Sequence, residues 1–175
     1  MSELLKNFDT FEKKRQNLIH SLENIGDEKL NTAPKVGEWS AIQVMWHLIS
    51  AEGNAVKYVR KKALGKNALQ TAGWGSSARL ILLNFVLALP IKFKAPKIVE
   101  AVPERVSWEE TKKEWEKVRQ ELRELLASFD ENEMRKPLFK HPLVGKMDLY
   151  QMLSFMESHF DRHLGQIKRA LSPPN

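Results

Sequence analysis

The chain has 175 residues, of which 42% are hydrophobic and 29% are charged, and it contains no cysteine. These proportions are those of an ordinary globular protein, and the length fits a single domain over residues 1–175 that buries its core without covalent crosslinks. The absence of cysteine excludes disulfides, thiolate nucleophiles and cysteine-ligated zinc sites.

The net charge of +6 is unevenly distributed along the chain. No acidic residue lies between Glu52 and Glu100, whereas nine lysine and arginine residues do, so residues 53–99 carry +9 and the rest carries −3. A region of one sign attracts anions, so it could serve an anionic small-molecule substrate, nucleic acid or a membrane surface. A solvated basic flank without any partner explains the pattern equally well.

No hydrophobic stretch has the length of a membrane span. The most apolar segment, residues 80–91, is interrupted by Asn84 and is far shorter than the roughly 20 residues that cross a bilayer. The first six residues mix both charges and are not followed by the apolar stretch of a signal peptide. We therefore expect a soluble, cytoplasmic protein without membrane association.

Helix start signals divide the chain into amphipathic segments. Three segments begin with the spacing of a capping box, in which two side chains three positions apart bind each other's backbone amides: Ser40 with Gln43, Ser107 with Glu110, and Asp148 with Gln151. Prolines separate the segments. No run alternates β-branched and polar residues, so no strand is predicted. The predicted helices cover residues 2–25, 40–64, 77–93, 107–128 and 148–171.

Four of these helices are long and amphipathic, as required to close a bundle around one core. The remaining segment, residues 77–93, is apolar on nearly all sides, so we expect it to be sandwiched within the fold or buried against a second subunit. The expected fold is all-α: a four-helix bundle with an additional apolar helix in the middle of the chain.

Two histidines of the last predicted helix lie on one edge of its apolar stripe. His159 and His163 are four residues apart, which makes their side chains neighbours and lets both imidazoles bind one ion. Gln166 extends the same edge and is a candidate to support His163 or to contact substrate. The alternative is a pair of hydrogen-bonded histidines at the boundary of the core.

The second predicted helix carries a polar but uncharged stripe between two apolar arcs. Its members are Gln43, His47, Ser50 and Asn54. A solvated helix face would carry lysine and glutamate, so this stripe indicates a partly buried polar cavity around His47. The alternative is a single hydrogen-bonded core histidine.

The remaining candidate polar residues have no comparable pattern around them. His20 and His141 are interpreted as surface residues. Glu157 and Asp161 neighbour the histidines in sequence but point to other faces of the helix. No side chain is identified as a general base.

Three motifs resemble those of the DinB/YfiT-like superfamily. Residues 37–48 (GEWSAIQVMWHL) are similar to its "W-S, then H-L" signature, and residues 157–167 (ESHFDRHLGQI) are similar to its closing H-x-x-R-H-x-x-Q-I pattern. Residues 141–145 (HPLVG) resemble the turn before the last helix. The resemblance implies a four-helix bundle in which His47, His159 and His163 bind one divalent metal ion. It also implies a homodimer, to which residues 77–93 are a candidate contributor.

The family includes metal-dependent hydrolases and enzymes that transfer low-molecular-weight thiols. Three histidines leave a divalent ion at least one open position, as in catalytic sites. We therefore expect a metal-dependent hydrolase or thiol transferase with zinc or nickel, in which a water or an anionic thiol at the open position is the reactive group. Gln43, Asn54 and Gln166 are candidates to orient the small-molecule substrate.

The alternative from a different functional class is a non-catalytic helical binding protein. In that case the metal site would be structural or vestigial, and the basic surface would contact an anionic partner. Nucleic acid is a disfavoured partner, because the chain has no helix-turn-helix signature and its basic residues do not alternate with exposed aromatic residues.

Overall fold

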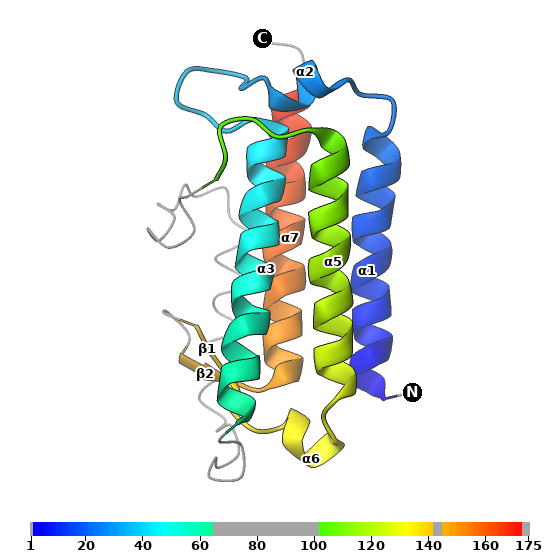
Figure 1. Cartoon of the computed structure of the whole chain (residues 1–175), viewed down its shortest axis with the longest axis vertical. Coiled ribbons are helices and arrows are strands. Elements are labelled where there is room, and N and C mark those ends of the chain that lie inside the picture. Colours follow the sequence, from blue (N-terminus) through cyan, green and yellow to red (C-terminus); the bar gives the residue numbers. More distant parts are fainter. Residues whose placement is uncertain (1, 65–101, 142–144, 173–175) are drawn as a thin grey trace.

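The protein is described by a computed structural model over residues 2–64, 102–141 and 145–172. In these ranges four long helices run side by side (Figure 1). They are α1 (Glu3–Leu22), α3 (Ala41–Ala63), α5 (Trp108–Ala127) and α7 (Leu149–Leu171). The bundle and its four predicted helices are thereby confirmed to within a few residues. The predicted apolar helix over residues 77–93 lies outside the described residues.

Shorter elements join the long helices. The one-turn helices α2 (Asp27–Asn31) and α6 (Glu131–Met134) follow α1 and α5, and the strands β1 (Phe139–His141) and β2 (Gly145–Met147) precede α7. The strands form an antiparallel hairpin in which Phe139 pairs with Met147. The prediction that the chain has no strand was wrong here, because a three-residue strand is too short to show an alternating pattern.

The two helices that carry the candidate histidines both begin with a complete capping box. The Ser40 hydroxyl accepts a hydrogen bond from the Gln43 N–H, and the Gln43 amide oxygen accepts one from the Ser40 N–H. Asp148 and Gln151 make the same reciprocal pair at the start of α7. These predicted caps satisfy amides that the first turn of a helix leaves without partners, and they determine where α3 and α7 begin.

Large aromatic side chains fill the core between the helices. Trp115 of α5 and Phe160 of α7 are fully buried, with ring centroids 6.1 Å apart. Phe11 of α1 meets Phe160 edge to face at 5.8 Å. Burial of each such side chain contributes about 1.5–3 kcal/mol to folding. Phe160 directly follows His159, so this packing also holds α7 in register beside the candidate site.

A buried ion pair joins α3 to α5 on the other side of α3 from His47. Glu52 and Arg119 are only 3% and 2% exposed. The Glu52 carboxylate accepts bonds from Arg119 Nε at 2.8 Å and from Trp115 Nε1 at 3.1 Å. Glu52 follows His47 by five residues, which corresponds to about 140° around an ideal helix. The structure assigns this carboxylate to helix packing.

No helix in the described ranges is both long enough and apolar enough to cross a lipid bilayer.

Candidate metal centre

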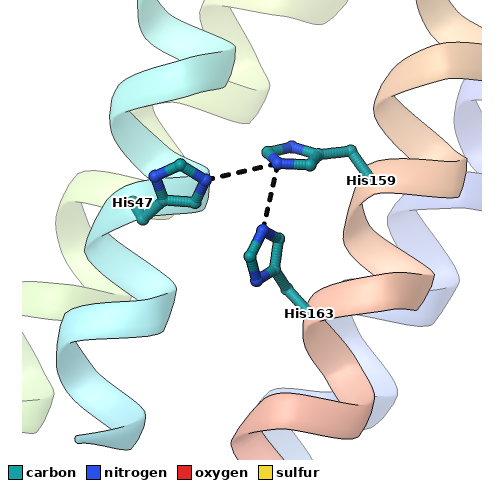
Figure 2. A group of neighbouring side chains, drawn as sticks. All are labelled: His47, His159 and His163. Atoms are coloured by element: carbon teal, nitrogen blue, oxygen red, sulfur yellow. Dashed lines mark hydrogen bonds between the residues drawn. The ribbon is translucent and has the colours of Figure 1, made fainter. Parts of the chain in front are cut away.

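Three histidine side chains meet between α3 and α7. His47 projects from the first half of α3, and His159 and His163 project from successive turns of α7 (Figure 2). Because α3 and α7 pack against each other, residues distant in sequence face one another across the helix interface. His47 is buried, whereas His159 and His163 are half-buried.

The three imidazoles point their Nε2 atoms toward one another. The Nε2 atoms of His47 and His159 are 3.2 Å apart, and those of His159 and His163 are 3.1 Å apart. One potential ligand atom from each ring lies within 4.8 Å of the others. Two nitrogens bound to one zinc ion at about 2.0–2.1 Å are separated by about 2.9–3.4 Å when the angle between them is 90–110°. The observed separations have this size.

Gln166 determines which nitrogen of His163 carries the proton. Its amide oxygen lies 2.9 Å from His163 Nδ1. Because a carbonyl oxygen only accepts hydrogen bonds, Nδ1 of the neutral ring donates, and Nε2 presents its lone pair to the centre. Such a partner on the far nitrogen orients histidines that bind metals and raises their basicity.

No choice of tautomers gives each of the two contacts among the three rings a donor and an acceptor of its own. With the His163 lone pair directed at His159, the contact needs an N–H on His159 Nε2. That atom then has no lone pair to accept a bond from His47, which also lies 3.2 Å from it. With the proton on His159 Nε2, that single N–H has to be shared between the lone pairs of His163 and His47; without it, the lone pairs of His159 and His163 face each other. A single cation at the centre of the group satisfies every lone pair at once.

The surroundings keep His159 and His163 neutral. Burial lowers the pKa of His163 to about 4, and the nearby His47 and Arg162 act in the same direction. Burial also lowers the pKa of His159 well below its usual value, and the nearby His163 and His47 lower it further. Since a metal ion binds the neutral imidazole, the lone pairs are available across the whole neutral pH range.

Aromatic rings flank the group from α7 and from the segment just before α3. The Trp39 ring lies 5.3 Å from that of His47. Phe155 is stacked on His159, with ring centroids 5.7 Å apart and an angle of 9° between the planes. The other neighbour of Phe155 is His141 of β1, at 4.5 Å.

The interpretation of His141 as a surface residue was therefore wrong. The β-hairpin brings His141 against α7, where its side chain is half-buried and burial lowers its pKa. The HPLVG motif before the last helix was the available signal. His20, in contrast, is exposed on α1 as predicted.

The three candidate orienting residues occupy different positions relative to the histidines. Gln166 contacts His163 directly. Gln43 lies one turn before His47 and is half-buried, and its amide oxygen binds the Ser40 N–H. Asn54 is exposed about two turns beyond His47, roughly 10 Å along the helix axis.

The carboxylates nearest to the ligands in sequence lie on the outer side of α7. Glu157 and Asp161 both bind Lys14 of α1, each at 2.7 Å. Both carboxylates therefore face α1 and not the histidines, as predicted. The two bonds to Lys14 also fasten α7 to α1.

The comparisons with known proteins agree with this arrangement. The DinB superfamily profile matches residues 10–167. The chain is also similar to the uncharacterised protein YuaE of Bacillus subtilis (strain 168), with 27% identity over 165 residues that cover 90% of this chain and 93% of that protein. No solved structure was matched. With its four-helix bundle and a family match over nearly its whole length, the chain belongs to the DinB superfamily.

Proposed function

We propose that this protein binds one divalent transition metal ion through the Nε2 atoms of His47, His159 and His163 and is a metal-dependent enzyme. The observation that carries the proposal is the convergence of three Nε2 atoms with separations of 3.1 and 3.2 Å. Zinc and nickel are the proposed ions, because an all-imidazole site suits these metals, whereas calcium and magnesium prefer oxygen ligands.

The proposed reaction is hydrolysis or the transfer of a low-molecular-weight thiol. When bound by three histidines, the ion supplies a Lewis acid with an open coordination position, which makes a water or a thiol nucleophilic near neutral pH. The basic residues 53–99 favour an anionic small-molecule substrate or thiol.

Several side chains of this protein have defined tasks in the proposal. His159 and His163 stay unprotonated at neutral pH because burial lowers the pKa of each. Gln166 holds the proton on His163 Nδ1 and thereby keeps Nε2 directed at the centre. The amide oxygen of Gln43 already accepts a hydrogen bond from the Ser40 N–H, so its NH₂ group is the part that could donate a hydrogen bond to a substrate. Asn54 offers an exposed amide farther along α3.

The proposed context is that of a single DinB-like domain over residues 1–175. We further propose that the protein works in the cytoplasm as a homodimer, with residues 77–93 as a candidate part of the subunit interface. Sedimentation of the purified protein would test the dimer.

Elemental analysis of tag-free protein tests the metal site. We expect about one equivalent of a single transition metal in the wild type and loss of that metal in His47→Ala and His163→Ala. His20→Ala is the matched control, because His20 is exposed on α1. A wild-type protein that takes up no zinc or nickel after incubation with either ion would refute the metal site.

Turnover separates an enzyme from the non-catalytic alternative. The metal-loaded protein would be assayed with an activated ester for hydrolysis, and with cysteine plus a chlorodinitrobenzene for thiol transfer. We expect one activity to require the metal and to disappear in His163→Ala. Full metal occupancy without turnover of either probe class would favour the alternative, a binding protein with a structural or vestigial site and a basic surface for an anionic partner.

A further inference from the structure

We propose that Phe155 is the positioning residue that sets the ring plane of His159, and that the β-hairpin holds Phe155 in place for this purpose. The inference rests on the proposed metal site and assigns to Phe155 a role in the affinity and geometry of that site. Phe155 would act through His159 and would not itself contact the ion.

The three histidines are held in different ways. His163 has Gln166 on its Nδ1 atom at 2.9 Å. For His159, the hydrogen bonds found in the described part of the chain involve only Nε2, the atom that faces the other two histidines. A ligand ring without a polar partner on its far nitrogen needs another means of orientation, because otherwise its χ2 angle is only weakly restricted.

Phe155 supplies that means by stacking. Phe155 and His159 are four residues apart on α7, so their side chains are neighbours on one face. Their planes are within 9° of parallel, with centroids 5.7 Å apart. The negative face of the phenyl ring also favours an imidazole that carries partial positive charge, as one does when it donates its lone pair to a metal ion.

The hairpin prevents Phe155 from turning away. Phe155 packs against Met147 of β2, which is fully buried. His141 of β1 lies 4.5 Å from the Phe155 ring, at an angle of 56°. Both strands therefore contact the side chain that stacks on His159. This gives the hairpin a role at the metal centre, although none of its residues belongs to the ligand group.

The test compares zinc affinity in wild type, Phe155→Leu, Phe155→Tyr and Tyr58→Leu, measured by competition with a chromogenic chelator. We expect Phe155→Leu to weaken binding by about 10-fold to 100-fold, as for other residues that orient ligands. Phe155→Tyr keeps the stacking face and should bind as the wild type does. Tyr58→Leu is the matched control, because Tyr58 packs on Phe139 of the same hairpin, at 5.8 Å, and makes no ring contact with a histidine.

Two further readouts distinguish positioning from general loosening of the fold. The visible spectrum of the cobalt-loaded protein should change in Phe155→Leu and not in Tyr58→Leu. In the metal-free wild type, we expect one sharp set of NMR signals from the His159 ring. In metal-free Phe155→Leu, these signals should be averaged or split into several sets. Equal zinc affinity and equal cobalt spectra in wild type and Phe155→Leu would overturn the inference. If the wild type binds no metal, the proposed function fails, and the NMR comparison alone decides whether Phe155 sets the ring plane.

Discussion

The Nε2 atoms of His47 and His159 lie 3.2 Å apart although 112 positions separate the two residues in the chain. Neither helix holds these ligands without the other, because α3 contributes one histidine and α7 contributes two. The group exists only when α3 packs against α7. A metal ion bound by this group would therefore be thermodynamically linked to the folded state.

The first prediction follows from this linkage. Zinc at about 100 times its Kd should stabilise the protein by about 2.7 kcal/mol, because the unfolded chain does not bring the three histidines together. Thermal unfolding with zinc and with a chelator measures the effect. His47→Ala should lose most of the stabilisation. A zinc-dependent rise in Tm of the same size in that variant would show that zinc binds elsewhere.

The second prediction concerns the hydrogen bond between Gln166 and His163. Gln166→Leu removes the acceptor on Nδ1, and we expect zinc affinity to fall about 10-fold to 100-fold. Gln166→Glu keeps an acceptor oxygen at the same reach and should retain affinity. Chelator competition at neutral pH measures both variants. Equal affinities for the leucine and glutamate variants would contradict the assigned role of this bond.

The third prediction is a pH dependence of the metal-free protein. The pKa of His163 is about 4 in the folded state, compared with about 6.5 for an exposed histidine. Between these values the unfolded chain binds protons that the folded protein excludes, so stability is present above pH 6.5 and is lost as the pH falls toward 4. For His163 alone the full loss amounts to about 3 kcal/mol.

Urea unfolding in the presence of a chelator, at about pH 7 and about pH 4.5, measures this loss. His163→Asn has no titrating ring at this position, so its stability should fall less over the same interval. Part of the decline in stability should remain in His163→Asn, because burial also lowers the pKa of His159. An identical decline in the wild type and in His163→Asn would exclude His163 as a source of the pH dependence.

The fourth prediction separates stability from metal binding. Glu52→Gln leaves Arg119 buried without its full counter-charge, and we expect the free energy of unfolding to fall by about 3 kcal/mol. Metal content should be unchanged, because Glu52 faces α5. Glu114→Gln is the control: it makes the same chemical change on α5, in a solvent-accessible pair with Lys117, and should have no measurable effect. Loss of metal in Glu52→Gln would link this ion pair to the centre.

Local sequence patterns were sufficient to predict the bundle and the candidate ligands. Hydrophobic periodicity located four long helices, and the capping pairs Ser40–Gln43 and Asp148–Gln151 located the starts of the two that carry histidines. These signals are readable because they arise from contacts three or four residues apart. The pairing of His159 with His163 has the same local origin.

The way in which the helices meet depends on contacts that the sequence does not show. The approach of His47 to α7 and the burial of Glu52 against Arg119 are contacts between segments far apart in the chain, and the contact of His141 with Phe155 joins the hairpin to α7. Helical periodicity shows which face of a helix is buried but not which partner covers it. The hairpin was missed because its three-residue strands are too short to show an alternating pattern, and they are defined instead by pairing with each other and by packing on α7. Local patterns therefore identified the ligands, and long-range packing determined the geometry that can hold a metal ion.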